Sequence, residues 1–439
     1  MAALRARTRR LVSDMSVGGS NRVIATVTAL GALILAACGS EPTVTETPAG
    51  TTLAVSDRQR ATTAPDTPVD EAARGLQTFG YQLIRENPQL IEDGNLVVSP
   101  ASIGVAFAMA RAGARGQTAT QIDAVLHFPD KGLGDAYNAL TRGWTSRGGK
   151  DAPQLSVANA IFAQNGFALE PDYLDTLARD FGAGVRQVDF ADGSAADVIN
   201  AWVKAETRDR IDKLFNDLDP ATQLVLANAV YLKATWERQF LADLTRPVPF
   251  HRADGTVVRP ETMSHHEPER YEYAATAKWS AVRMPYLGEE LAMWVLLPTA
   301  RDGDPVALLE PAVLTTAMDQ ARGQRVDLSL PKWDFQSDLP LNDPLTRMGM
   351  SVPFSAMADF SGISPAGLHI DQAVHRADIT VDEKGTEAAA VTGIGFVVSA
   401  GPSPDVSMTV DHPFAFAIVH EPSGAPLFEG VVGDPTAIQ

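Results

Sequence analysis

The sequence predicts an α+β fold in which helices and strands interleave irregularly within one large domain. Residues 71–439 contain no second linker and no internal repeat, although their length alone would suggest two or three domains. Leu76 and Phe79 belong to a pattern of apolar residues at helical spacing, whereas residues 223–233 and 291–297 are short apolar runs typical of buried strands.

Helix starts are indicated at three places. Ser99 offers a hydroxyl that can cap a helix, and Pro100 suits the first helical position. Thr118 is followed three residues later by Gln121, a spacing that resembles a capping box. A third start is expected at Ser194.

The end of the chain has the signature of a β-hairpin. Two apolar runs, residues 414–420 and 427–432, flank the turn-forming residues 422–424. We therefore expect the C-terminus to be part of a sheet.

The N-terminal region has the pattern of an export signal. Five arginines are followed by residues 23–37, an apolar run that is too short and wrongly flanked for a membrane-spanning helix. The run ends in Leu-Ala-Ala before Cys38, which resembles the lipobox of bacterial lipoprotein precursors. This predicts a lipoprotein signal peptide over residues 1–37 and lipid on Cys38, with the exported protein anchored extracytoplasmically to the cell membrane or cell envelope. The alternatives are an uncleaved signal anchor and an ordinary secretory signal cut near Ala37.

The segment after the signal has a composition unlike that of a packed domain. Residues 38–70 are rich in Thr, Pro and Ala and contain almost no large apolar residue. This predicts a disordered tether that leads to a folded domain at residues 71–439. Because Cys38 is the only cysteine, that domain has no disulfide and must be stabilised by packing.

The chain carries a large excess of acidic residues after its basic N-terminal region. Its formal charge is −18, and removal of residues 1–37 takes away five basic residues and one acidic residue, which leaves −22. Such an excess of negative charge disfavours nucleic acid as a partner. The acidic residues are scattered, so a solvated and soluble surface is the simplest interpretation.

Common catalytic motifs are missing from the sequence. There is no G-x-S-x-G elbow, no S-x-x-K and no phosphate-binding P-loop. His265 and His266 precede Glu267 without the H-E-x-x-H spacing of a zinc site, so we expect these histidines to be solvated. We expect no enzymatic activity, no metal and no cofactor. The alternative of a periplasmic hydrolase would need a nucleophile and a base, and the sequence shows no such pair.

Nine short blocks occur in a fixed order along the domain. They are NLVVSPASI at residues 95–103, GARGQT at 113–118, INAWV at 199–203, LANAVYLK at 226–233, MPYLG at 284–288, LPK at 330–332, ADFSGI at 358–363, AVH at 373–375 and PLFEG at 426–430. Together these blocks resemble the serpin family over essentially all of residues 71–439. Each block alone is weak, but their number and order argue strongly against a chance match.

The resemblance implies the serpin fold, with three β-sheets, eight or nine helices and an exposed reactive loop near the C-terminus. It also implies a cluster of side chains that controls the opening of the largest sheet while filling its core. Within this cluster, Lys332 is expected to pair with Glu383 at the hinge of the loop, an interaction worth little if it is exposed. The cluster comprises Ser99, Ser102, Asn228, Trp236, Lys332 and His375.

Residues 383–392 resemble the hinge of inhibitory serpins. If this segment enters a sheet as a strand, alternate side chains must face the core. The face with Thr386, Ala388 and Ala390 is uncharged, and small side chains can pass between packed strands. Outside the resemblance, the same run would suit a flexible loop or a short helix. The hinge residues are Glu383, Gly385, Thr386, Glu387, Ala388, Ala389, Ala390 and Thr392.

Insertion of this loop is expected to release free energy. Burial of Ile394, Phe396 and Val398 is worth about 1.5–3 kcal/mol each, and on the order of ten ladder hydrogen bonds add roughly 0.5–1.5 kcal/mol apiece. The sum, about 10–20 kcal/mol, exceeds the stability of a typical domain. A molecule with the loop outside the sheet is therefore expected to be metastable.

The family's spacing places the cleaved bond at Ser399-Ala400, within the window of residues 398–402. No Lys or Arg occurs between Gly385 and Pro413, which argues against trypsin-like targets. Small and aliphatic residues favour elastase-like or subtilisin-like proteases, whereas a bond after Phe396 would suit a chymotrypsin-like protease.

The resemblance thus implies a monomeric inhibitor with a serine protease as its partner. The protease serine attacks the carbonyl of Ser399 and an acyl-enzyme forms; the freed loop then inserts before water hydrolyses the complex. The membrane is the second partner, through the lipid on Cys38. The alternative is a non-inhibitory serpin that acts as a carrier, a chaperone or a protease substrate.

Overall fold

The computed structural model describes residues 50–89, 94–144, 153–386 and 403–437. All of them belong to one compact unit that begins at Thr45. Within the described ranges there are eight α-helices, in agreement with the expected eight or nine. They are α1 (Val69–Arg85), α3 (Pro100–Gly113), α4 (Gly116–Leu126), α5 (Leu133–Trp144), α6 (Pro171–Thr176), α7 (Ala195–Glu206), α8 (Pro311–Gln320) and α9 (Asn342–Arg347).

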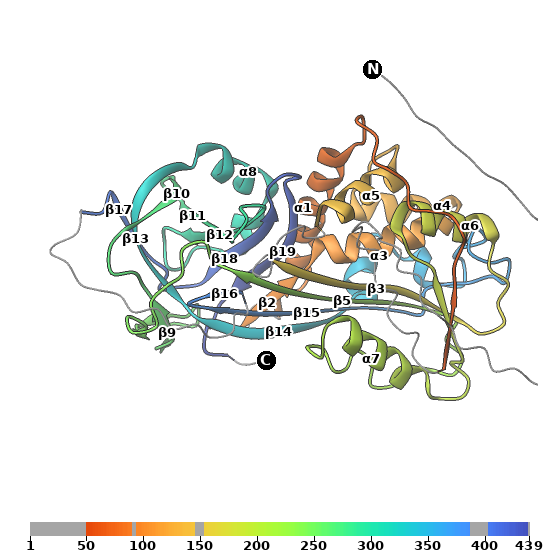
Figure 1. Cartoon of the computed structure of the whole chain (residues 1–439). Coiled ribbons are helices and arrows are strands. Elements are labelled where there is room, and N and C mark those ends of the chain that lie inside the picture. The colour runs from red at the N-terminus through yellow and green to blue at the C-terminus, as the bar shows by residue number, and fades with distance from the viewer. Residues whose placement is uncertain (1–49, 90–93, 145–152, 387–402, 438–439) are drawn as a thin grey trace, which may run out of the picture. The chain divides into compact units, whose positions relative to one another are not determined.

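The sheet that contains the hinge, here called sheet A, has seven strands. Strands β5 and β15 are parallel neighbours from the pair Gln372 and Val225 to the pair Asp378 and Tyr231. The short strand β16 enters between them at one end (Figure 1). In spatial order the strands are β1 (Thr51–Ala54), β4 (Val185–Val188), β3 (Gln154–Gln164), β5 (Leu224–Thr235), β16 (Gly385–Thr386), β15 (Gln372–Asp382) and β14 (Trp333–Pro340).

A second hydrogen-bonded sheet of ten strands divides into two parts at β13 (Arg322–Pro331). The first residues of β13 pair with β10, and its later residues pair with β17 and β9. The two parts correspond to the second and third sheets of the expected fold, here called sheets B and C. Sheet B contains β2 (Asn95–Val98), β19 (Ala425–Val432), β18 (Phe414–His420), β12 (Leu291–Pro298), β11 (Trp279–Pro285) and β10 (Glu269–Ala275), and sheet C contains β13, β9 (Glu261–Met263), β6 (Arg246–Pro247) and β17 (Val406–Thr409).

Helices cover both faces of sheet A. On one face α3 packs against β3 and β5, and it also contacts β19 of sheet B; almost every residue of α3 is buried. On the other face lies α7 (Figure 1), where Trp202 packs edge-on against Phe162 of β3 with 5.4 Å between the ring centroids. A strand of sheet A can therefore move only if both layers allow it.

The expected C-terminal hairpin and the first expected cap are confirmed. Strands β18 and β19 pair in antiparallel fashion around the turn at Gly424. The Ser99 hydroxyl accepts a hydrogen bond from the backbone N–H of Ser102 at 3.2 Å and so caps α3.

The expected capping box at Thr118 is wrong, because α4 begins two residues earlier, at Gly116. The Thr118 hydroxyl instead accepts from the backbone N–H of Asp359, and the Gln121 side chain accepts from that of Val352. These side chains join α4 to a distant segment. Ser194 precedes α7 as expected but forms no cap, since its hydroxyl donates to Asp192.

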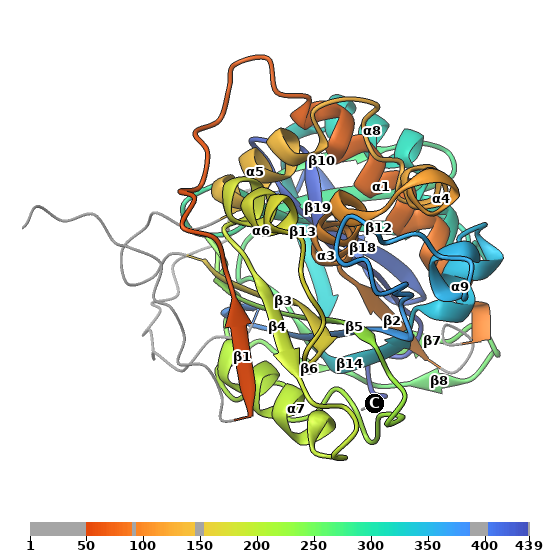
Figure 2. The same cartoon turned by 90° about the vertical axis from the view of Figure 1, so that its right-hand side faces the viewer.

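Part of the segment that we expected to be a tether folds as a strand of the domain. Strand β1 pairs with β4 along the edge of sheet A, from the pair Thr51 and Val188 to the pair Ala54 and Val185 (Figure 2). The prediction of a disordered tether over residues 38–70 is therefore wrong from Thr51 onward. Backbone pairing to an open sheet edge supplies the stabilisation that the composition of this segment lacks.

No helix within the described ranges combines the length and apolar character needed to cross a bilayer.

Candidate functional site

Asn228 is the centre of a buried polar cluster beneath sheet A. It lies on β5, directly opposite His375 of β15 and Asn159 of β3. Its amide N–H groups donate to the Ser102 hydroxyl at 2.6 Å and to the Asn159 side-chain oxygen. Four expected residues, Ser99, Ser102, Asn228 and His375, are thus brought together across the junction of β5 and β15.

His375 is held neutral in this cluster. Its Nε2 accepts a hydrogen bond from the backbone N–H of Ser99 at 3.0 Å, so the proton resides on Nδ1 and is donated to the Asn228 side-chain oxygen. Complete burial lowers the pKa of His375 to about 3. The bond between His375 and Asn228 joins the two strands that would separate if sheet A opened.

A second group of aromatic side chains lies where β16 enters the sheet. The rings of Trp236 and Tyr286 are stacked, with 4.4 Å between centroids and 14° between planes. The Trp236 indole N–H donates to the carbonyl of Asp382 at 3.0 Å, and the Tyr286 hydroxyl bonds to that of Thr386 at 2.7 Å. The hinge residue Thr386 is consequently buried, with 1% of its surface exposed.

Gly385 fits this position because it lacks a side chain. Its φ of +154° lies in the region that favours glycine, and a Cβ atom there would be 2.0 Å from the carbonyl oxygen of Ala234. The close approach lets β16 pair with β5 and β15 at once.

Glu383 anchors the chain just before the hinge. Its carboxylate accepts from Lys332 at 2.9 Å and from the Thr245 hydroxyl at 2.8 Å, and its carbonyl accepts from the backbone N–H of Phe240. Burial raises the pKa of Glu383, but the hydrogen bonds from Lys332 and Thr245 outweigh burial and leave it lowered. With 13% of the Glu383 side chain exposed, the pair is more than a surface contact.

The outer face of the junction between β5 and β15 is covered by the connection between α7 and β5. Arg376 of β15 binds Asp338 of β14 and donates to the carbonyl of Lys213 in this connection. Arg210 of the same connection lies over the ring of Tyr231 on β5, 5.6 Å from its centroid. A strand inserted between β5 and β15 would have to pass beneath this segment.

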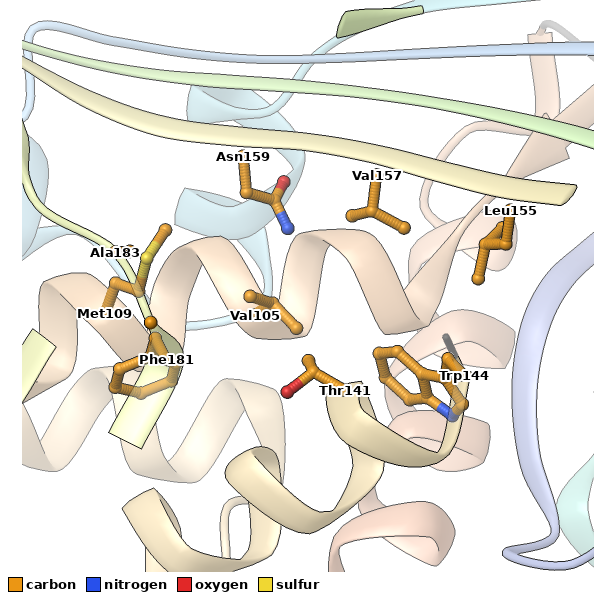
Figure 3. Close-up of a pocket in the computed structure, with 10 residues that line it drawn as sticks. Val105, Met109, Thr141, Trp144, Leu155, Val157, Asn159, Phe181 and Ala183 are labelled. Carbon is orange, nitrogen blue, oxygen red and sulfur yellow. The ribbon is translucent and has the colours of Figure 1, made fainter. Parts of the chain in front are cut away.

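A cavity of about 320 Å³ lies on the helix side of β3. Val157 and Asn159 face it from β3, and Val105 of α3 and Trp144 of α5 face it from below (Figure 3). Asn159 both faces this pocket and bonds to Asn228, so the pocket borders the polar cluster.

Three residues of the site had not been singled out from the sequence: Asn159, Tyr286 and Thr245. Tyr286 lies in a block used for the resemblance, but nothing local in the sequence indicates that its hydroxyl meets Thr386. Several expected residues lie outside the described residues, and their positions stay predictions. They are Cys38, Glu387, Ala388, Ala389, Ala390, Thr392, Ser399 and Ala400.

His265 is not a solvated loop residue as expected. Its ring stacks on Phe240 at 4.4 Å and its Nε2 lies 2.9 Å from the Tyr271 hydroxyl. Burial, followed by the charge of Arg238, lowers the pKa of His265 to about 4. Across the described part of the chain, no cluster of three or more His, Cys, Asp or Glu side chains could hold a metal ion.

A seven-stranded sheet with a hinge strand between parallel neighbours, closed by a polar cluster, defines the class of serpins. The family model for "Serpin (serine protease inhibitor)" matches residues 74–435, and this chain belongs to that family. The family is described as serine protease inhibitors, and the chain is not an enzyme.

Several known proteins are similar to this chain over most of its length. Leukocyte elastase inhibitor of Sus scrofa is 33% identical, covering 81% of this chain and 97% of that protein. Iripin-2 of Ixodes ricinus is 36% identical (77% and 87% covered), and an uncharacterised serpin-like protein of Thermococcus kodakarensis is 35% identical (82% and 85%). Among solved structures, the thermophilic serpin tengpin in its native state has a TM-score of 0.77 at 26% identity, covering 87% of this chain and 99% of tengpin. Native protease nexin-1 with heparin has a TM-score of 0.73 at 31% identity, covering 84% and 100%.

Proposed function

We propose that this protein traps serine proteases covalently by inserting residues 387–398 as a new strand between β5 and β15. The register of β16 carries this proposal. Gly385 lies opposite Thr235 of β5 and opposite Asp382 of β15, and both pairings are antiparallel. Strand β16 therefore supplies the first two residues of a strand that would lie between both neighbours.

If the antiparallel pairing of β16 continues residue by residue along the loop, each loop residue has a defined partner on β5 and on β15. Thr392 would lie opposite both Asn228 and His375, which now face each other directly. The new strand would break the bond between them, and the Thr392 hydroxyl could replace it. Ala388 and Ala390 would fall on the same inner face, where small side chains are needed.

We propose that cleavage occurs at Ser399-Ala400 and that the targets are elastase-like or subtilisin-like proteases. The loop offers no Lys or Arg for a trypsin-like pocket. Three relatives of the chain are named leukocyte elastase inhibitors, which supports an elastase-like target.

We also propose that the protein is exported as a lipoprotein and held at a membrane by lipid on Cys38. The small residues before this cysteine, and the apolar run of residues 23–37, support the proposal. Intact mass of the protein purified from membranes, with and without Cys38→Ser, would test it.

The inhibitory function is tested by incubating residues 39–439 with pancreatic-type elastase and with subtilisin. The expected result is a covalent complex on a denaturing gel, with a cut that mass spectrometry places at Ser399-Ala400. If several proteases cut the loop but form no complex, and the cut protein does not melt at a higher temperature, the chain is a non-inhibitory serpin.

Two variants make the test specific to insertion. Thr386→Arg would place a charge on the buried face of the new strand, so the protease should cut the loop without being trapped. Glu387→Arg places the same side chain on the opposite face and should leave trapping largely intact. Equal behaviour of the two variants would contradict the proposed register.

A further inference from the structure

The N-terminal segment is docked at the end of sheet A that lies opposite the hinge. Thr51 pairs with Val188, which is level with Gln164, the last residue of β3. The neighbouring residue of β3 pairs with Leu224, the first residue of β5. The hinge meets β5 eleven residues later, at Thr235, which is about 36 Å along the strand.

Side-chain contacts hold this segment in addition to the β1 ladder. Ser56 and Arg58 both donate to the carboxylate of Asp175, and Arg58 does so at 3.0 Å. Arg60 donates to the Asn138 side-chain oxygen at 2.9 Å, and the Asn138 amide donates to the Ala61 carbonyl at 2.9 Å. The chain is thus attached to the body from Thr51 through Ala61, before it reaches α1.

The end of the body where Thr51 docks is acidic. Exposed aspartates lie in the loop after β4, in the first turn of α7 and in the loop before β5. Residues 187–203 and 214–232 contain no Lys or Arg to neutralise them. These aspartates, here called the acidic end, are Asp192, Asp197, Asp217 and Asp219.

We propose that the docked segment sets the orientation of the membrane-anchored protein, with the acidic end toward the bilayer and the hinge away from it. The inference rests on the proposed lipid at Cys38. Twelve residues separate Cys38 from Thr51, so the lipid can lie at most about 45 Å from the docking point. Without docking, the tether would continue to Val69, and no particular end of the body would be held near the membrane.

Charge opposes direct contact between the acidic end and the bilayer, so the docking of β1 near the short tether is what holds this end toward the membrane. Anionic headgroups give a membrane a negative surface potential, which repels the acidic end within about a Debye length. The short tether and this repulsion act in opposite directions and keep the body near the surface without contact. A protease that arrives from outside would then meet the hinge end first.

Energy transfer to the membrane tests the orientation. Because Cys38 is the only cysteine and would carry the lipid, a single added cysteine can be labelled uniquely. Asp219→Cys labels the acidic end, and Ser407→Cys labels an exposed position on β17 beside the hinge end. The full lipidated protein is placed in vesicles of phosphatidylcholine and phosphatidylglycerol that contain an acceptor lipid. Transfer is expected to be severalfold stronger from position 219 than from position 407; equal or reversed values would overturn the orientation.

Two insertions of the same flexible 20-residue sequence provide the matched control. Inserted after Glu46, it lengthens the tether and should lower transfer from both labels. Inserted after Thr62, in an exposed stretch that follows the docked segment, it should leave both values unchanged. If the two insertions act alike, docking of β1 does not set the orientation.

The outcomes separate this inference from the proposals on which it rests. If the wild type does not float with vesicles, or Cys38→Ser floats equally well, the lipid anchor and the orientation both fail. If the protein floats and traps a protease on a gel, but the two labels give equal transfer, only the orientation fails.

Discussion

Gly385 lies at a point of the hinge where the neighbouring strand leaves no room for a side chain. A methyl group there would collide with the backbone of β5, at the carbonyl of Ala234. We expect Gly385→Ala to expel β16 from sheet A and to delay insertion, so that more inhibitor is cut per protease trapped. Titration of elastase should show the number of inhibitor molecules consumed rising severalfold.

Gly193→Ala is the matched control for this substitution. Gly193 also has a positive φ, but a Cβ atom there would meet nothing within 4 Å. An unchanged titration for Gly385→Ala would show that pairing of β16 does not matter for trapping.

Glu429 is a buried carboxyl group in β19. Among the described residues neither of its side-chain oxygens has a hydrogen-bond partner, and it lies against Gly80 of α1. Burial raises the pKa of Glu429 well above its ordinary value of 4.5, so the native protein holds it neutral.

The pH dependence of stability follows from this raised pKa. Above pH 4.5 the unfolded chain loses the Glu429 proton while the native protein keeps it, so the unfolding free energy falls by about 1.4 kcal/mol per pH unit until the native pKa is reached. We expect Glu429→Gln to melt at a higher temperature than the wild type at pH 8, with the difference vanishing near pH 4.5. The exposed Glu267→Gln should show no such trend; a pH-independent effect of Glu429→Gln would contradict the interpretation.

At the scale of elements, β5 and β15 are joined by the cluster around Asn228. We expect Asn228→Ala to remove the bonds to Ser102 and His375 and to leave buried polar groups unpaired, at a cost of about 1–3 kcal/mol. Sheet A should then open more readily, and inhibitory activity should decay faster during incubation at a temperature below melting. Asn216→Ala, at an exposed position, is the control; an equal rate of decay would show that the cluster does not restrain the sheet.

Elements whose signals are local could be predicted from sequence. The start of α3 depends on Ser99 and its own helix, and this prediction is confirmed. Thr118 carries the same kind of signal, but its hydroxyl is used by Asp359, 241 residues later, which no local pattern reveals. Strand β1 has no strand pattern of its own and exists because β4 offers an open edge.

The candidate site could be predicted only in part, for the same reason. Asn228 and His375, which the resemblance assigns to one cluster, face each other across β5 and β15, because the family's blocks encode positions in the fold. The resemblance did not reveal partners such as Thr245, whose role depends on a hydrogen bond to Glu383, 138 residues away. Contacts of this kind depend on tertiary geometry rather than on spacing along the chain.

For the whole molecule, the proposed function predicts that cleavage of the loop stabilises the protein. Insertion is worth about 10–20 kcal/mol, which corresponds to a rise in melting temperature on the order of 15 °C for a domain of this size. Calorimetry before and after cleavage within residues 398–402 measures the change. Thr386→Arg, cut at the same bond, should show little or no rise; a similar rise in this variant would mean that insertion does not proceed through the hinge.

The two paired residues of β16 also affect how fast the loop can insert into sheet A. An acyl-enzyme with ordinary turnover survives for about a millisecond to a second, whereas strand pairing of a hairpin takes about 1–10 μs. The slow part of adding a strand is bringing its first residues into register, since chain entropy is lost before contacts form. Here Gly385 and Thr386 are already in register, so the protein would begin this kinetic competition with hydrolysis after the slowest stage.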